Sequence, residues 1–324
     1  MRAVLCKAYG GPETLVVDEM ETPRPGPGEV LVRVGLAALN FFDTLIIQGK
    51  YQFKPELPFS PGAELCGTVE AVGEGVEGWQ PGERVAASIG WGACREYVLA
   101  RPDQLVRVPE GVRDEQAAGL TVTYGTSLHA LKDRAKLQPG ETLAVLGAAG
   151  GTGLAAVELG ALMGARVIAC ASSPDKLALA REHGAELTLD YSAENLRDGL
   201  KRLTDGEGVD VIYDPVGGDL AEPALRSMAW KGRYLVVGFA GGAIPKFPLN
   251  LLLLKGCDVQ GVFWGDFVRR EPAANAANIA DLLSWTAQGR LRAHVHGIYP
   301  IEEVSAALDV IARREARGKV LIRL

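Results

Sequence analysis

The sequence predicts an α/β protein with a doubly wound parallel sheet in one domain and a second, β-rich domain. Three observations lead to this prediction: the pattern changes near residue 116, six apolar runs then alternate with helical stretches, and a glycine-rich turn follows the first of these runs. A chain of 324 residues, of which 48% are hydrophobic, is long enough to bury two cores. We therefore expect a β-rich domain over 1–115, completed by 266–324, and a parallel-sheet domain over 116–265.

The β-rich domain is predicted from short runs of strand-forming residues that Pro and Gly interrupt. The runs cover 29–34, 66–72, 84–87 and 94–99, and a helical stretch near 40–48 is the one exception. Short strands without long helices are typical of a twisted antiparallel or barrel-like sheet.

The parallel sheet is predicted from the alternation of apolar runs with helical stretches. These runs are 142–148, 166–171, 187–190, 209–215, 233–239 and 258–263. Six parallel strands are the number that a doubly wound dinucleotide-binding fold contains. Between them, 154–163 is apolar nearly all round and should be buried, whereas 174–183 is amphipathic, with Ser173 as its N-cap and Pro174 in its first turn.

The end of the chain is expected to return to the β-rich domain. Two helices are predicted over 275–288 and 301–313, and 318–324 is predicted as a closing strand. A domain made of two segments around an inserted one should leave a cleft between the domains, and ligands commonly bind in such clefts.

Composition argues against several classes of function. The formal net charge of −6 repels nucleic-acid backbones, and the basic cluster at 313–319 suits the end of a helix, so we do not expect nucleic acid as a main partner. Five scattered cysteines without a CxxC spacing favour reduced thiols over a disulfide framework or a zinc cluster. The longest aliphatic run, 249–254, is too short to span a membrane, so we expect a cytoplasmic protein.

The glycine-rich turn within 143–153 leads from a strand into a helix, which is the context required of a dinucleotide fingerprint. If Ala148 takes the position of the first fingerprint glycine, Gly150 lets the backbone approach a pyrophosphate and Gly153 allows the helix to pack closely on the strand. Backbone N–H groups at the helix start would then face the phosphates. The alternative is that small residues merely pack a tight turn. The predicted cofactor-binding residues of this turn are Ala149, Gly150, Gly151, Thr152 and Gly153.

The residues after the second apolar run distinguish NADPH from NADH. An NAD site usually carries an acidic residue about 20 positions beyond the fingerprint, which binds the ribose hydroxyls. Here the run ends in Ser173 without an acid, and Asp175 lies in a helix first turn, where an acid is expected anyway. Lys176 and Tyr191 offer a positive charge and a hydrogen bond to a 2′-phosphate, although an exposed lysine is often only solvated. We therefore expect NADPH as the cofactor.

A series of short motifs runs through nearly the whole chain in a fixed order. The motifs are NFFDT at 40–44, GAE at 62–64, GTVEAVG at 67–73, PGERV at 81–85, PGE at 139–141, the turn at 148–153, DPVG at 214–217 and GKV at 318–320. Together they resemble the zinc-independent quinone oxidoreductases of the medium-chain dehydrogenase/reductase superfamily, the group that includes zeta-crystallin. The resemblance implies a GroES-like catalytic domain, a Rossmann domain and usually a homodimer.

The resemblance also implies cofactor contacts outside the glycine-rich turn. The residues that match the nicotinamide end of the site are Thr126, Gly238, Phe239 and Phe263. The residues that match the 2′-phosphate pocket are Ser173, Lys176 and Tyr191.

The same comparison predicts a site without metal. Zinc-dependent relatives place a cysteine where Asn40 lies and a histidine where Ala63 lies, and they carry a cluster of four cysteines, none of which is present here. His294 and His296 form at most an HxH pair without a third ligand.

Without zinc to polarise a carbonyl, the chemistry is expected to be hydride transfer from the reduced nicotinamide to a conjugated acceptor, a quinone or an α,β-unsaturated carbonyl. The resemblance implies Asn40, Asp43 and Tyr51 as catalytic residues. The hypothesis is that Tyr51 or a bound water donates the proton while Asn40 orients the acceptor. The alternative is that Asn40 and Asp43 only cap the helix that they begin. Trp264 is a candidate flat wall for a ring substrate.

Two other functions stay open at this stage. An enone or enoyl-thioester reductase would use the same domains and the same hydride, although no basic stripe for coenzyme A phosphates stands out. A non-catalytic, crystallin-like NADPH-binding protein is the second alternative.

Overall fold

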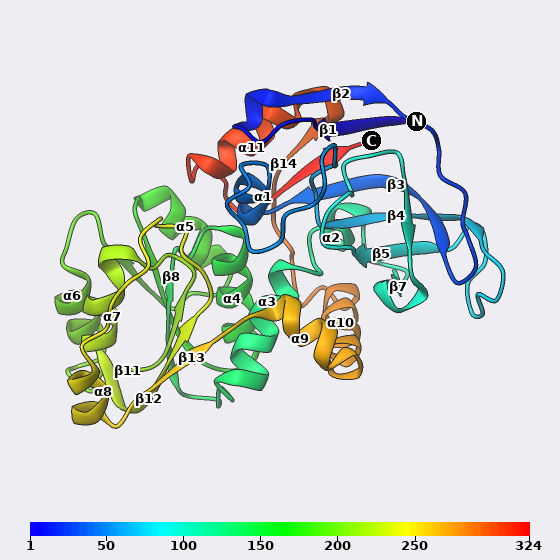
Figure 1. Cartoon of the computed structure of the whole chain (residues 1–324). Helices are drawn as coiled ribbons and strands as arrows, with labels where there is room; N and C mark the ends of the chain where they lie inside the picture. Colours follow the sequence, from blue (N-terminus) through cyan, green and yellow to red (C-terminus); the bar gives the residue numbers. More distant parts are fainter. The chain divides into compact units, whose positions relative to one another are not determined.

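The computed structural model describes residues 1–324, which divide into two compact units (Figure 1). Unit 1 comprises Met1–Val122 and Ile279–Leu324, and unit 2 comprises Thr123–Asn278. The chain thus leaves unit 1 after 122 rather than 115, because helix α2 (Asp114–Ala118) packs against the sheet of unit 1. It returns within helix α10 (Pro272–Ala287), whereas the sequence placed the return at 266.

Unit 1 is built on a mixed sheet that joins strands from both of its chain segments. In sheet order its strands are β14 (Val295–Pro300), β15 (Lys319–Arg323), β3 (Val30–Leu39), β4 (Glu64–Val72), β5 (Arg84–Ser88) and β7 (Leu105–Arg107), with β6 (Tyr97–Ala100) paired to β3. β15 runs antiparallel to β3, so that Val320 lies opposite Leu39. β1 (Arg2–Cys6) and β2 (Leu15–Glu19) form a separate hairpin.

Short helices complete unit 1. α1 (Phe41–Ile46) follows β3 directly, and α11 (Val304–Ala312) packs against α1 and β15. Single 3₁₀ turns lie at Pro12–Thr14, Pro102–Gln104 and Ile301–Glu303. The core is formed by alternate side chains of the strands, such as Val32 and Leu65, together with Leu308 of α11, and all of these are fully buried.

Unit 2 has the predicted six-stranded parallel sheet. Its order is β10 (Leu187–Asp190), β9 (Arg166–Ala171), β8 (Thr142–Leu146), β11 (Val209–Asp214), β12 (Met228–Val236) and β13 (Asp258–Gly261). In chain order this is 3-2-1-4-5-6, the arrangement of a doubly wound Rossmann fold, in which the strand order reverses between β8 and β11. The predicted fold class is confirmed.

The helices of unit 2 alternate with the strands as predicted. They are α3 (Thr123–Leu128), a π-helical segment (His129–Arg134), α4 (Gly151–Leu162), α5 (Pro174–Glu182), α6 (Leu196–Leu203), the 3₁₀ turn Gly218–Leu220, α7 (Ala221–Arg226), α8 (Leu249–Lys255) and α9 (Trp264–Arg270). Most of α4 is buried, as its apolar sequence predicts. Ser173 is the N-cap of α5, but its side chain makes no capping hydrogen bond. None of the helices combines the length and the apolar character that a membrane-spanning helix requires.

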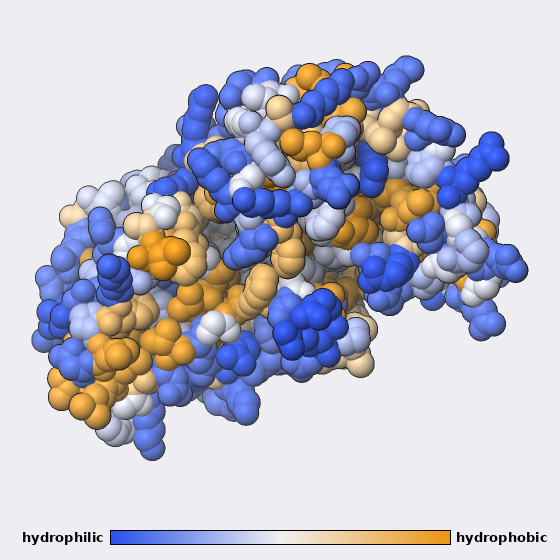
Figure 2. All heavy atoms as spheres, viewed as in Figure 1, coloured by the Kyte–Doolittle hydropathy of each residue, from blue (hydrophilic) through white to orange (hydrophobic).

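One face of unit 2 carries large apolar side chains in contact with solvent. Leu249, Leu253 and Leu254 of α8 are 77%, 80% and 71% exposed, and Trp230 and Ile244 are similarly open. Figure 2 shows apolar side chains gathered where α8 lies in Figure 1. The three leucines and Trp230 are named here the α8 patch. They lie close to β13, the edge strand of the parallel sheet, because α8 leads through Gly256 into β13 and Trp230 packs against Gly256.

Candidate functional site

The glycine-rich turn connects β8 to α4 at the centre of the parallel sheet of unit 2. Gly147 has φ +60°, a left-handed backbone conformation that favours glycine, whereas Ala148 has an ordinary negative φ. Ala148 can therefore replace a fingerprint glycine without strain, and its N–H donates to Cys170 O of β9 at 3.1 Å. A Cβ on Gly153 would collide with Gly147 O, so Gly153 is required for α4 to begin this close to β8.

The first turn of α4 offers unpaired backbone donors. Gly150 is the N-cap and makes no side-chain cap bond, and the N–H groups of Gly151, Thr152 and Gly153 have no partner within the chain. Free N–H groups at a helix N-terminus form an anion site, strengthened by the helix dipole. A Cβ on Gly150 would touch only Gly147 O, at 3.4 Å, so this glycine is not required by the turn itself. The turn thus fits the pyrophosphate of a dinucleotide.

Two buried hydroxyl groups, those of Ser127 and Tyr213, support the start of α4, and neither residue was identified from the sequence. Ser127 Oγ lies 2.9 Å from Thr152 O and 2.8 Å from the hydroxyl of Tyr213 in β11. Burial raises the pKa of Tyr213, which therefore stays neutral. Thr126, the predicted nicotinamide-end residue, precedes Ser127 on α3 and is 9% exposed. The position of Tyr213 near the carboxyl end of the central strand β11 is the signal that could have found it.

The predicted 2′-phosphate residues gather at the carboxyl end of β9. The N–H of Tyr191 donates to Ala171 O at 3.1 Å, which fixes Tyr191 beside the end of this strand. Ser173 and Lys176 lie at the start of α5, and Lys176 Nζ is 3.4 Å from the hydroxyl of Ser172. Ser172 was not among the predicted residues, although its place after an acid-free strand was visible. The arrangement provides hydroxyl and ammonium donors at the point where an NAD site carries an acid.

The predicted nicotinamide-end residues follow the neighbouring strands β12 and β13. Gly238 and Phe239 come after β12, and Phe263 caps α9 after β13, so the parallel sheet brings them to the same edge. Phe239 and Phe263 are 37% and 46% exposed. The ring of Trp264 packs against Gly125, where an added Cβ would come within 3.0 Å of it, and its Nε1 is buried without a partner.

The carboxylate of Asp214 holds the DPVG turn that borders this edge. It accepts hydrogen bonds from the N–H groups of Val216 and Gly217, both at 2.8 Å, and from the hydroxyl of Tyr234 at 2.5 Å. Burial raises the pKa of Asp214, and the three donors oppose this by favouring the carboxylate. Because the side chain of Val216 fills the space beside Gly147, Asp214 also supports the glycine-rich turn.

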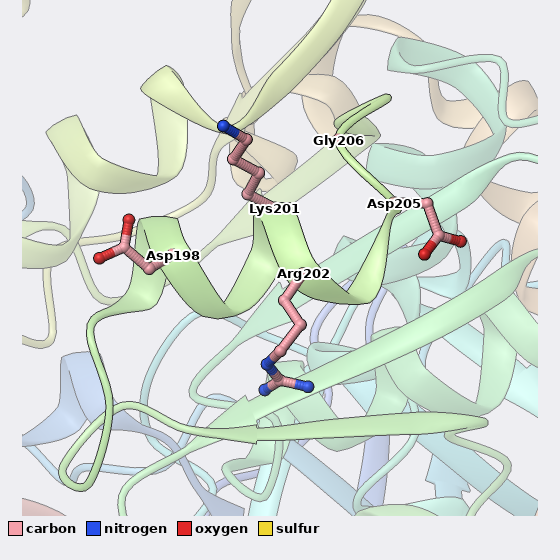
Figure 3. Close-up of a pocket in the computed structure, with 5 residues that line it drawn as sticks. All are labelled: Asp198, Lys201, Arg202, Asp205 and Gly206. Atoms are coloured by element: carbon pink, nitrogen blue, oxygen red, sulfur yellow. The ribbon is translucent and has the colours of Figure 1, made fainter.

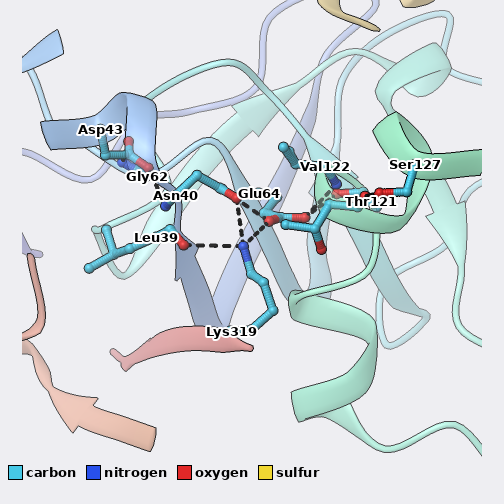
Figure 4. Close-up of polar contacts among 10 residues, drawn as sticks. Leu39, Asn40, Asp43, Gly62, Glu64, Thr121, Val122, Ser127 and Lys319 are labelled. Carbon is cyan, nitrogen blue, oxygen red and sulfur yellow. Dashed lines mark hydrogen bonds and ion pairs between the residues drawn. The ribbon is translucent and has the colours of Figure 1, made fainter. Parts of the chain in front are cut away.

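The three predicted catalytic residues lie in unit 1, on and after α1. Asn40 is the N-cap of α1, and its side chain contacts Glu64 and Lys319 (Figure 4). Tyr51 stacks on Phe42 of α1 with ring centroids 5.3 Å apart, and burial raises the pKa of its hydroxyl. Tyr51 therefore keeps its proton at neutral pH.

Asp43 is fully buried in the first turn of α1. Its two carboxylate oxygens accept hydrogen bonds from the N–H groups of Asn40 at 2.7 Å and Gly62 at 2.9 Å. Desolvation raises the pKa of Asp43 to about 6, although these two donors favour the charged form. In this arrangement the carboxylate joins the start of α1 to the loop before β4.

No group of three or more His, Cys, Asp and Glu side chains in residues 1–324 is arranged to hold a metal ion. His296 Nδ1 accepts a hydrogen bond from the N–H of Arg317 at 3.2 Å. One hollow of about 370 Å³ lies on the surface of α6 and is lined by charged side chains such as Lys201 and Arg202 (Figure 3). It contains none of the predicted site residues, and we assign it no function.

Two family models match the two parts of the chain. An alcohol dehydrogenase GroES-like domain matches 26–110, and a zinc-binding dehydrogenase domain matches 151–281. The order of the domains, the Rossmann sheet and the glycine-rich turn together define a dehydrogenase of the medium-chain dehydrogenase/reductase superfamily.

Full-length relatives narrow this class. Quinone oxidoreductase-like protein 2 of Bos taurus is 40% identical over 325 residues, which cover 100% of this chain and 92% of the relative. The quinone oxidoreductase of Pseudomonas aeruginosa is 36% identical over 97% of both chains. The crystal structure of Escherichia coli quinone oxidoreductase complexed with NADPH has a TM-score of 0.93 and 28% identity over 100% of both chains. The chain therefore belongs to the quinone oxidoreductase family, as the motifs predicted.

Proposed function

We propose that this chain is an NADPH-dependent quinone oxidoreductase that works without zinc. The proposal rests on two features of unit 2. The start of α4 has free backbone N–H donors, and hydroxyl and ammonium groups stand after β9 where an NAD site would have an acid. The quinone oxidoreductase relatives, one of them complexed with NADPH, support it.

In this proposal each part of the cofactor is held by groups already described. The N–H groups of Gly151, Thr152 and Gly153 bind the pyrophosphate, while Ser173, Lys176 and Tyr191 bind the 2′-phosphate. Ala149 and Gly150 belong to the same turn and let its backbone approach the pyrophosphate. The residues proposed around the nicotinamide are Thr126, Gly238, Phe239 and Phe263. When bound, NADPH supplies a hydride to the acceptor.

On unit 1, the proposed roles differ among the three residues. Asn40 orients the acceptor, and Tyr51 or a solvent water provides the proton. Asp43, with both oxygens bonded to backbone N–H groups, holds the turn that presents Asn40. Zinc independence rests on Asn40 and Ala63, which stand where zinc-dependent relatives have ligands.

The direct test follows NADPH absorbance with o- and p-quinones, simple enones and enoyl-CoAs, with NADH in parallel. We expect oxidation of NADPH by quinones, slower oxidation of NADH, and full activity after exhaustive dialysis against a chelator. Faster turnover of enoyl-CoAs would favour the thioester reductase. Tight NADPH binding without oxidation by any acceptor would establish a non-catalytic binding protein instead.

We also propose a cytoplasmic homodimer. The five cysteines are buried and free, in keeping with a reducing compartment. The α8 patch is a large exposed apolar surface beside an unpaired sheet edge, and β13 can pair with its own copy about a two-fold axis, continuing the sheet while the leucines pack together.

Sedimentation of two variants checks the dimer. Wild type is expected to sediment as a dimer and Leu253→Glu as a folded monomer, because a charge at this 80% exposed position would be buried in the interface. Val16→Glu, which alters an exposed apolar residue of β2, should remain dimeric. A monomeric wild type at working concentration, or a dimeric Leu253→Glu, would contradict the proposal.

A further inference from the structure

A buried polar cluster lies where β3, β4 and β15 of unit 1 meet. Asn40 follows β3, Glu64 begins β4 and Lys319 begins β15. The side chains of Lys319 and Glu64 are 3% and 0% exposed, and Lys319 Nζ lies 2.7 Å from Glu64 Oε1. Figure 4 shows the three side chains pointing toward one another. They form a neutral, desolvated group that includes the Asn40 amide.

Lys319 and Glu64 are fully occupied by this cluster. The ammonium has three N–H donors, which it gives to Leu39 O at 3.1 Å, Asn40 Oδ1 at 2.7 Å and Glu64 Oε1 at 2.7 Å. The other carboxylate oxygen, Glu64 Oε2, accepts from Thr121 Oγ1 and from the N–H of Val122, both at 2.7 Å. Neither charged group therefore has a donor or acceptor left for a ligand.

The cluster fixes the direction of the Asn40 amide. Its Oδ1 faces the ammonium of Lys319, and its Nδ2 donates to Glu64 Oε1 at 3.1 Å. A reversed amide would place an NH₂ group against an ammonium and an oxygen against a carboxylate, so only the observed orientation is allowed. An amide nitrogen carries two hydrogens, and one of these has no partner within the chain.

We propose that Lys319 and Glu64 are positioning residues that hold the Asn40 amide in one orientation, with its nitrogen available only as a hydrogen-bond donor. The second Nδ2–H of Asn40 then donates to the carbonyl oxygen of the acceptor. The inference rests on the proposed quinone reductase function and specifies how the acceptor is held. The acceptor gains a hydride, which is one hydrogen with two electrons, as the nicotinamide is oxidised, and its oxygen becomes an oxyanion that then takes up a proton. A fixed N–H donor at that oxygen stabilises the charge as it develops.

The decisive measurement is the carbonyl stretch of ¹³C=O-labelled 2-cyclohexen-1-one, a conjugated acceptor with a single carbonyl group, bound with NADP⁺, a complex in which both components are oxidised and no reaction occurs. A hydrogen bond lowers this frequency. We expect a lowered, single band in wild type and its loss in Asn40→Leu, which is close in size to asparagine, adds no charge and has no N–H. The same variant should reduce kcat about a hundredfold, as loss of an oxyanion donor does in other enzymes, and leave NADPH affinity unchanged.

The role of Lys319 and Glu64 is tested by removing the charges together. Lys319→Met alone leaves a buried unpaired carboxylate and is expected to fold poorly. The double variant Lys319→Met with Glu64→Gln is neutral, and it allows the Asn40 amide to take either orientation. We expect a folded protein with two carbonyl bands and kcat reduced about tenfold. Lys7→Met, which removes an exposed ammonium, should behave as wild type.

The outcomes separate this inference from the proposed function. Normal quinone turnover with the same carbonyl frequency in wild type and Asn40→Leu would overturn the donor role alone. Full kcat and a single lowered band in the folded double variant would overturn the positioning role. If none of the quinones tested supports NADPH oxidation by the wild-type protein, the proposed function fails and the inference fails with it.

Discussion

Adding one methyl group at Gly150 is expected to weaken NADPH binding by about tenfold or more while the fold stays intact. At this position a Cβ would meet only Gly147 O at 3.4 Å, an ordinary contact, and the backbone has φ −74°, which alanine adopts freely. The unfolding free energy of Gly150→Ala should therefore stay within about 0.5 kcal/mol of wild type. The methyl group would instead stand where the pyrophosphate approaches the backbone, and a tenfold loss of affinity corresponds to about 1.4 kcal/mol.

The same substitution at Gly153 is the matched control, because there the methyl group meets the protein itself. Its Cβ would lie 2.9 Å from the backbone carbon of Gly147 and would collide with the oxygen of that residue. Gly153→Ala should lower the unfolding free energy by about 1–3 kcal/mol as the start of α4 shifts from β8.

Denaturant unfolding and fluorescence titration with NADPH would check this pair of variants. Equal destabilisation of both would mean that the turn, and not the ligand, requires Gly150. Unchanged NADPH affinity in Gly150→Ala would remove the first turn of α4 from the proposed cofactor site.

The parallel sheet could be predicted because local patterns specify it. The strands at 166–171 and 187–190 have the predicted bounds, since each is a short apolar run between turn-forming residues. The strand predicted over 142–148 ends at Leu146 because Gly147 turns the chain. β12 begins at Met228 rather than 233, because Lys231 and Gly232 in its first half are poor strand formers and interrupt the apolar run.

The polar cluster around Lys319 could not be predicted, because its members are distant in the chain. Lys319 is 255 positions from Glu64 and 279 from Asn40, and the pairing of β15 with β3 and of β3 with β4 brings them together. The sequence places Lys319 in a basic cluster that suits the end of a helix, whereas in the structure its side chain is 3% exposed and bound within the polar cluster. No local pattern distinguishes a buried lysine from a solvated one when its partners lie on other strands.

Burial of Asp43 was also hidden from the sequence, and it leads to a pH-dependent stability. The pKa of Asp43 is about 6 in the folded protein, against an ordinary value of 3.8, because desolvation raises it more than its hydrogen bonds lower it. Between these values the folded protein binds the proton more tightly than the unfolded chain does, so this group makes stability fall as pH rises from about 4 to about 6. A pKa difference of about two units corresponds to about 3 kcal/mol.

Asp43→Asn should remove this dependence because the amide does not titrate. Relative to wild type, its unfolding free energy should increase by up to about 3 kcal/mol between pH 4 and pH 7, as the wild-type protein takes on the buried charge. At pH 4 the two proteins should be similar in stability. A protonated carboxyl group and an amide each carry hydrogen on one of their two polar atoms, so in both proteins one of the backbone N–H groups of Asn40 and Gly62 faces a donor instead of an acceptor.

Urea unfolding across this pH range, with Asp18→Asn as the control, tests the sign of the effect. Asp18 is exposed, and its hydrogen bond with Lys7 lowers its pKa, so it adds stability above its ordinary pKa. Since its ordinary pKa of 3.8 lies at the lower end of this range and its folded pKa lies lower still, that stability is nearly all present at pH 4, and the difference between Asp18→Asn and wild type should change little between pH 4 and pH 7. A flat difference for Asp43→Asn would show that the carboxylate is already ionised at pH 4. In that case the N–H donors of Asn40 and Gly62 outweigh desolvation, and Asp43 holds the α1 turn as a permanent anion.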